Sequence, residues 1–130
     1  MHPSYIVSKI EIKMPSKVLI RTFSYLELLA AIRNKKTREL VLKDLSKGNS
    51  AIFESLSEIC KNIILGNIRL KAADKSKLKK YKNLIVALAS KPKTKSIQNK
   101  LIVQSGDALP LLIPIVAGIL GEYIGSKIFK

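Results

Sequence analysis

The stretch SAIFESLSEICKNIILG, residues 50–66, carries the clearest structural pattern in the chain. Its apolar residues recur at intervals of three and four, which is the spacing of one face of an α-helix. Ser50 is suited to cap the N-terminus of such a helix, and Gly66 is suited to end it. The pattern predicts an amphipathic helix whose core-facing stripe consists of Ile52, Phe53, Leu56, Ile59, Cys60 and Ile63.

Weaker helical patterns precede this stretch. Ser24 is followed by Glu27 three residues later, which is the spacing of a capping box, so a helix is expected to begin at Ser24. The polar cluster Asn34-Lys35-Lys36-Thr37 is expected to break or bend it, and Thr37 is suited to cap a second short helix that ends at Gly48. Residues 5–12 alternate weakly and contain β-branched side chains, which favours a short strand or an extended arm.

Two further helices are expected downstream. One runs from about Ala73 to Ser90, with Asp74 as its cap. Its apolar seam, which is expected to pack on the preceding helix, consists of Leu78, Tyr81, Ile85 and Leu88. The other runs from about Thr94 to Gln104 and turns Ile97 and Leu101 inward.

The fold class follows from these patterns. The alternating segments that a β or α/β core needs are missing, so the sequence predicts an all-α protein. We expect a small bundle of four to five short helices with a hydrophobic C-terminal helical tail. Three segments are expected: an N-terminal arm over 1–23, a basic helical domain over 24–104, and an apolar tail over 105–130. An extended conformation is one possibility for the arm. The tail opens with a flexible break at residues 105–107.

The composition argues against several kinds of chemistry. The chain has 130 residues, of which 47% are hydrophobic, with one cysteine and one histidine, His2. One cysteine is too few for a disulfide scaffold or a cysteine-rich metal site. Cys60 lies in the apolar stripe without a histidine to activate it, so a buried structural thiol is expected. We therefore predict a protein that is not an enzyme and that needs no cofactor and no metal.

The charge points instead to a polyanionic partner. The formal net charge is +15, and residues 67–106 hold 11 basic residues against one acidic residue. Only four of the 24 basic residues are arginines, and lysine neutralises phosphate without the bidentate base contacts that arginine makes. Non-sequence-specific binding of phosphate is expected, although a lysine-rich surface also serves solubility alone. The predicted phosphate-binding residues are Lys75, Lys77, Lys79, Lys80, Lys82, Lys91, Lys93, Lys95 and Lys100.

The apolar tail leaves three interpretations open. In the first, the tail docks on the protein's own body or on a copy of itself. In the second, it inserts into or disturbs a membrane. In the third, it docks on another protein. Its uncharged run from Ala108 to Gly121 has 14 residues, fewer than the roughly 20 that a spanning helix needs. Small residues recur every fourth position, which permits close helix–helix approach. The predicted self-association or membrane residues are Leu109, Leu112, Ile113, Ala117, Gly121 and Gly125.

Residues 38–121 resemble a family of viral proteins. The run Ser105-Gly106-Asp107-Ala108-Leu109-Pro110-Leu111-Leu112-Ile113-Pro114-Ile115-Val116-Ala117 is similar to the C-terminal region of the adenovirus core precursor, protein X. The body resembles the small basic proteins of adintoviruses and Polinton (Maverick) elements. The residues that match are Asn62, Gly66, Asn67, Leu70, Lys79, Lys80, Tyr81, Lys82, Leu101, Gln104 and Gly106.

The resemblance implies a minor virion core protein that neutralises and condenses packaged double-stranded DNA. Its expected locations are the virion core and, during assembly, the host nucleus. The tail would associate with itself, with capsid protein or with a membrane. In the adenovirus relative a maturation protease cuts at a Gly-Gly pair, which implies processing at Ser105, Gly106 and Asp107 here. The chain departs from the family by having Ser105 in place of the first glycine, and by being rich in lysine rather than arginine.

Two rival hypotheses belong to other classes. In the first, the lysines bind anionic lipid and the tail inserts, so that the protein is membrane-active. In the second, the chain is a cellular helical interaction domain with a basic surface.

Overall fold

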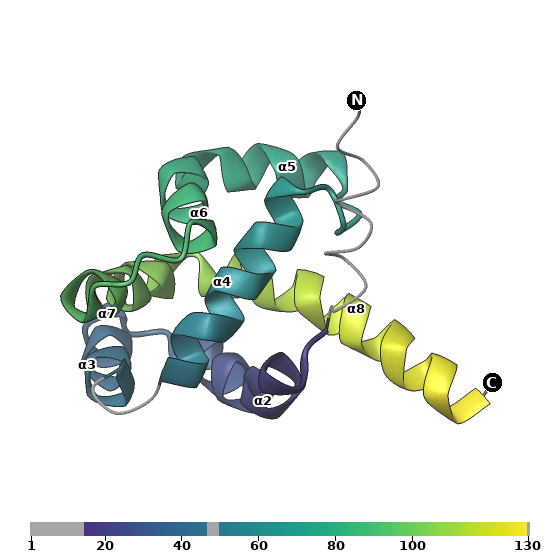
Figure 1. The fold of residues 1–130 in the computed structure, drawn as a ribbon, viewed down its shortest axis with the longest axis horizontal. Helices are drawn as coiled ribbons and strands as arrows, with labels where there is room; N and C mark the ends of the chain where they lie inside the picture. Colours follow the sequence, from purple (N-terminus) through teal and green to yellow (C-terminus); the bar gives the residue numbers. More distant parts are fainter. Residues whose placement is uncertain (1–14, 47–49, 130) are drawn as a thin grey trace.

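The predicted amphipathic helix lies at the centre of the molecule (Figure 1). In the computed structural model, which describes residues 15–46 and 50–129, it forms α4 (Ser50–Ile64). Ile52, Leu56, Ile59 and Cys60 have no exposed surface and Phe53 is 2% exposed, so the predicted stripe is confirmed. The helices that pack around α4 are α2 (Lys17–Ala31), α3 (Lys35–Ser46), α6 (Lys82–Ala89) and α7 (Lys95–Gln104).

The C-terminal end of α4 is closed by a hydrogen-bonded cap. Gly66 has a φ of +78°, a left-handed conformation that glycine adopts without steric penalty. The amide of Gly66 donates to the Ile63 carbonyl at 3.2 Å, and the amide of Asn67 donates to the Asn62 carbonyl at 2.9 Å. This pair of bonds is a Schellman motif. The asparagines and the glycine that carry part of the viral resemblance therefore act here as a helix cap.

The first described helix begins earlier than predicted. Its cap is Ser16, whose hydroxyl oxygen accepts a hydrogen bond from the Leu19 amide at 3.2 Å and donates to the Glu58 carboxylate on α4. Ser24, the predicted cap, lies exposed within α2, and residues 17–23, expected in the N-terminal arm, are helical. The prediction failed because a capping serine is defined by where its backbone leaves the helix, which the serine pattern alone does not show. The possible strand at 5–12 lies outside the described residues.

Helix α3 is separated from α2 by residues 32–34, so Asn34 of the polar cluster lies in the break while the other three residues of the cluster begin α3. The side chain of Asn34 accepts a hydrogen bond from the Thr37 amide at 3.0 Å, so Asn34 has the capping role that was predicted for Thr37. Leu42 is fully buried, whereas Leu40 is 67% exposed. Gly48, the predicted end of this helix, lies outside the described residues.

The helix predicted over residues 73–90 is broken into three parts. These are α5 (Ala72–Leu78), a 3₁₀ turn η1 (Lys79–Tyr81) and α6. The predicted cap, Asp74, lies in the first turn of α5, and the N-cap position is Lys71, which makes no side-chain capping bond. Of the four seam residues, Leu78, Ile85 and Leu88 are buried as expected and Tyr81 is half-buried, because the break leaves each segment's apolar face on the core.

Helix α7 starts near the predicted residue but presents a different face to the core. Leu101 and Ile102 are buried, while Ile97, expected to point inward, is 46% exposed. Only the C-terminal half of α7 reaches the core, because the chain turns there into a second 3₁₀ turn, η2 (Ser105–Asp107).

The predicted tail forms one long helix, α8 (Leu109–Phe129), that packs on α2 and η2. Its C-terminal turns extend beyond the body of the molecule (Figure 1). The described residues form helices, turns and loops without strands, which confirms the predicted all-α bundle. Five residues of α8 belong to the hydrophobic core: Leu109, Leu112, Ile113, Val116 and Leu120.

Candidate nucleic-acid interface

The lysines of the basic stretch lie on the surface. Ten lysines occur between residues 71 and 100, and the side chains of all ten are exposed. The same stretch contains one acidic residue, Asp74. Within the part of the chain that the structure describes, one of these ten lysines forms an ion pair: the Lys91 nitrogen lies 4.0 Å from a carboxylate oxygen of Glu54. The stretch therefore keeps nearly all of its positive charge available to a partner.

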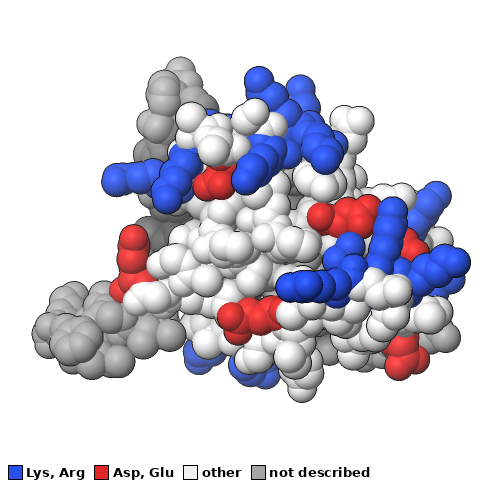
Figure 2. Space-filling model, turned by 180° about the vertical axis from the view of Figure 1, so that it is seen from behind, with Lys and Arg blue, Asp and Glu red and all other residues white. Residues whose placement is uncertain are grey.

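Lys and Arg gather in two groups on the face seen in Figure 2. In this view one group covers the upper part, where α5 lies, and the other covers the right-hand side, where α3 and α7 lie. A few more basic side chains show along the lower edge. An uncharged band and several acidic side chains separate the two groups. The basic zone that is continuous in sequence is thus divided in space.

The first group, the α5 group, consists of exposed lysines on α5 and η1. Four lysines within six residues of chain must repel one another at these short distances. The ammonium group of Lys80 lies 5.7 Å from the centre of the Tyr81 ring, a cation–π distance. Lys82 continues the group at the start of α6. The members taken from the prediction are Lys75, Lys77, Lys79 and Lys80.

The second group, the α3–α7 group, joins two segments that are far apart in sequence. Lys95 and Lys100 on α7 are exposed, and α7 packs directly against α3. Helix α3 contributes two exposed lysines that the sequence pattern did not predict: Lys36, and Lys35, which forms an ion pair with Asp107 at 3.4 Å. No local sequence signal would have included them, because their proximity to α7 depends on helix packing. Lys91 and Lys93 lie in the loop that connects α6 to α7.

The predicted processing segment is ordered rather than flexible, so that expectation was wrong. Ser105 is fully buried and Gly106 is buried within η2, and the Ser105 hydroxyl donates to the Ile102 carbonyl. A Cβ atom added to Gly106 would lie 3.0 Å from Leu42 Cδ1. Asp107 is exposed, and its carboxylate is held by Arg38 at 3.0 Å. The close approach of α3 explains why the break is packed.

The predicted tail residues do not form a single surface. Leu109, Leu112 and Ile113 are buried in the protein's own core, so they are not available for self-association or membrane contact in the folded chain. Ala117 and Gly121 are exposed. Gly125 lies in α8 beyond the residues whose side chains are described.

No single described helix has both the length and the apolar composition to cross a membrane. One pair of segments, Lys95–Asp107 and Leu109–Tyr123, meets these criteria together but is bent by 87°.

Cys60 is buried, and burial raises the pKa of its thiol to about 12. A thiol in this state is a poor nucleophile, because the reactive species is the thiolate. The buried position agrees with the structural role expected from the sequence.

Comparison of the chain with family models, curated proteins and solved structures finds no match.

Proposed function

We propose that this chain binds double-stranded DNA through non-sequence-specific phosphate contacts made by its two lysine groups. The observation that carries the proposal is the exposure of ten lysines between residues 71 and 100 alongside one acidic residue. Ammonium groups placed this close repel one another unless anions lie between them. The phosphates of a duplex occur regularly along its axis and supply that anion density.

Two separated basic groups on one small molecule favour condensation over simple coating. A protein with one cationic patch neutralises one segment of DNA, whereas two separated patches contact two segments or two turns of the same duplex. The resemblance of residues 38–121 to virion proteins supports placing this activity in a viral particle. We therefore propose a minor virion core protein that condenses packaged DNA and that acts in the host nucleus during assembly.

The test is the salt dependence of binding to random-sequence duplex DNA, measured by fluorescence anisotropy with the full chain. The logarithm of the association constant should fall linearly with the logarithm of salt concentration, with a slope of roughly −0.9 for each phosphate contact. Two duplexes of different sequence should bind equally well. A strong preference for one sequence would contradict the proposal.

A matched pair of triple variants assigns the contacts. In the first variant Lys75→Gln, Lys79→Gln and Lys80→Gln remove three charges from the α5 group. The control removes three exposed charges elsewhere with Lys17→Gln, Arg21→Gln and Lys61→Gln. The first variant should reduce the slope by about 2.7, from roughly 0.9 per lost contact. Equal losses in both variants would show diffuse attraction by net charge and would overturn the assignment to this group.

The membrane-active alternative predicts a different result. Leakage of anionic vesicles by a chain that fails to retain duplex DNA at low salt would replace the proposed function with that alternative.

Proteolytic processing near Gly106 stays a prediction. A protease needs an accessible backbone, and this segment is packed in η2, so η2 would have to open before it is cut. Mass spectrometry of purified particles that finds uncut chain alone would remove the prediction.

A further inference from the structure

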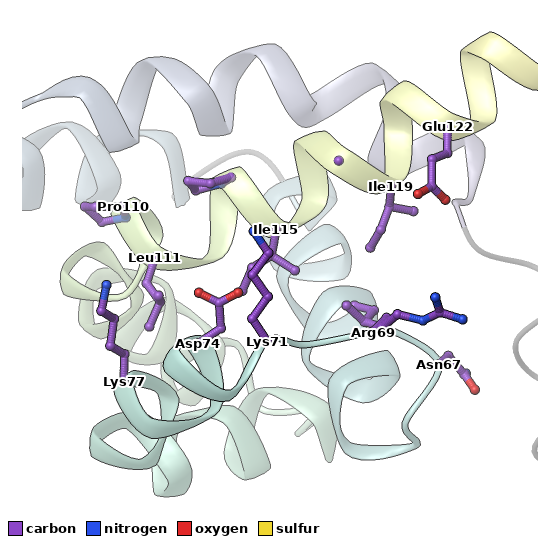
Figure 3. Close-up of a pocket in the computed structure, with 13 residues that line it drawn as sticks. Asn67, Arg69, Lys71, Asp74, Lys77, Pro110, Leu111, Ile115, Ile119 and Glu122 are labelled. Carbon is purple, nitrogen blue, oxygen red and sulfur yellow. The ribbon is translucent and has the colours of Figure 1, made fainter.

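A groove of about 890 Å³ runs alongside α8, on the side away from the core (Figure 3). One wall belongs to α8, and the other belongs to α5 and the loop that precedes it. The α8 wall repeats at intervals of four along one face of the helix. Its residues are Pro110, Leu111, Pro114, Ile115, Gly118, Ile119 and Glu122.

The most exposed apolar residues on this side of α8 are small, whereas Leu111, Ile115 and Ile119 are half-buried in the groove. Pro114 and Gly118 are exposed in the groove lining, and Ala117 and Gly121 are exposed beside it. A Cβ atom added to Gly118 or Gly121 would meet nothing within 4 Å, so packing within the chain does not explain these glycines. Each glycine in a helix interior reduces stability by roughly 1 kcal/mol relative to alanine.

This composition favours a helical partner over a lipid surface. Helices that lie in a membrane interface use large side chains such as Leu, Phe and Trp on the inserted face. A face of small side chains gains little from lipid, but it allows another backbone to approach closely. An amphipathic or apolar helix laid along the groove is therefore the occupant that suits its shape.

The charges along the groove differ between its two ends (Figure 3). Lys77, Lys71 and Asp74 lie opposite the Leu111–Ile115 part of α8, where cations outnumber anions by one. Glu122 lies at the far end, where Arg69 lies on the opposite wall, so the charges at that end balance. A second α8 that runs in the opposite direction reverses this order, so its own Glu122 meets the cationic end. The groove is thus electrostatically complementary to a copy of one of its own walls.

We propose that this groove binds α8 of a second copy of the chain, with the two helices antiparallel and crossing at Gly118. At a rise of about 1.5 Å per residue, Glu122 lies about 6 Å along α8 from the crossing point, so Glu122 of each copy lies beside Pro114 of the other. That register places Glu122 within reach of Lys71 and Lys77 of the second copy. The interface is isologous, since each copy supplies the same residues.

Charge reversal tests the pairing. Sedimentation equilibrium of the full chain, without nucleic acid, should show a monomer–dimer equilibrium. Glu122→Lys should weaken the dimer about tenfold, because two symmetric charge contacts become repulsive. Combining it with Lys71→Glu and Lys77→Glu should restore the dimer. The control is Glu27→Lys, the same charge change at an exposed site on α2, which should leave the dimer unchanged.

Disulfide trapping tests the crossing point. Gly118→Cys places two thiols at the crossing, within the short Cβ–Cβ distance that a disulfide needs, and mild oxidation should yield a covalent dimer. Gly121→Cys makes the same change one turn later, outside the groove lining, and should yield none. The native Cys60 does not interfere, because it is buried.

Three results would overturn the proposal: a monomer at all accessible concentrations, no rescue in the charge-swapped variant, or equal cross-linking at positions 118 and 121. Binding of the monomer to vesicles of uncharged lipid, which the lysines do not attract, would identify lipid as the occupant instead. The dimer does not depend on the proposed DNA binding, because the lysines altered in the DNA experiment lie outside the groove lining. Each proposal is therefore open to failure without the other.

Discussion

Arg38 on α3 and Asp107 in η2 form an ion pair across 69 residues of sequence, with 3.0 Å between Arg38 Nη2 and Asp107 Oδ1. The same guanidinium donates from Nη1 to the Ile32 carbonyl at 3.0 Å. The Arg38 side chain is 10% exposed. One buried arginine thus connects the end of α2, helix α3 and the turn that leads into α8.

We expect Asp107→Asn to lower the free energy of unfolding by about 1–2 kcal/mol. The substitution leaves the buried Arg38 charge without its carboxylate, although partial exposure of Asp107 limits the loss. Chemical denaturation followed by circular dichroism measures the effect. Asp44→Asn, at an exposed position on the same helix as Arg38, is the control and should change stability by less than about 0.5 kcal/mol. Equal effects from the two variants would contradict a structural role for this ion pair.

The two serines near the start of α2 should respond oppositely to alanine. Ser16→Ala should lower the unfolding free energy by about 1 kcal/mol, since it removes the cap of the Leu19 amide and the bond to Glu58. Ser24→Ala, in the exposed interior of the helix, should be neutral or slightly stabilising, because alanine has the higher helix propensity. Thermal unfolding of both variants measures the difference. The reverse order would restore the sequence-based position of the cap.

The first half of α8 should behave as core. Leu112→Ala should lower the unfolding free energy by about 2–5 kcal/mol, because Leu112 is 1% exposed among other buried side chains. Ala117→Ser, at an exposed position of the same helix, is the control and should have little effect. Denaturant unfolding monitored by circular dichroism measures both. A small loss for Leu112→Ala would mean that α8 is an appendage that the body does not need.

The Cys60 thiol should report on opening of the core. In the folded protein it should resist a thiol-specific reagent near pH 8, and it should react fully in denaturant, because burial raises its pKa to about 12. Above pH 9 the unfolded thiol ionises while the folded thiol stays protonated. The folded state then binds more protons, so stability falls as the pH rises.

The pH dependence has its own control. Unfolding free energies of the wild type and of Cys60→Ala are compared between pH 8 and pH 10.5. The wild type should lose stability more steeply, by up to about 1.4 kcal/mol per pH unit. Parallel curves, or rapid labelling of the folded protein, would show that the thiol is accessible.

Much of the local structure follows from sequence patterns. The stripe of α4 was predicted residue by residue, because a three-and-four spacing of large apolar side chains leaves one way to bury them. The end of α4 at Gly66 also followed, since few residues other than glycine adopt φ of +78°. The exposure of Lys75 and Lys95 followed as well, because an unpaired ammonium group is rarely buried.

Other features depended on contacts between distant segments. Which serine caps α2 was decided by Glu58, a residue of another helix. Ile97 is exposed because packing brings only the last turns of α7 to the core.

By itself, the sequence determined the all-α class, the course of the central helix and the excess of lysine over acid, since spacing and charge are properties of neighbouring residues. The tertiary structure alone decided that the lysines form two groups, that residues 105–107 are packed, and that one face of α8 is core while another borders a groove. These features arise from the packing of helices whose partners lie tens of residues away, and no local pattern encodes such distances.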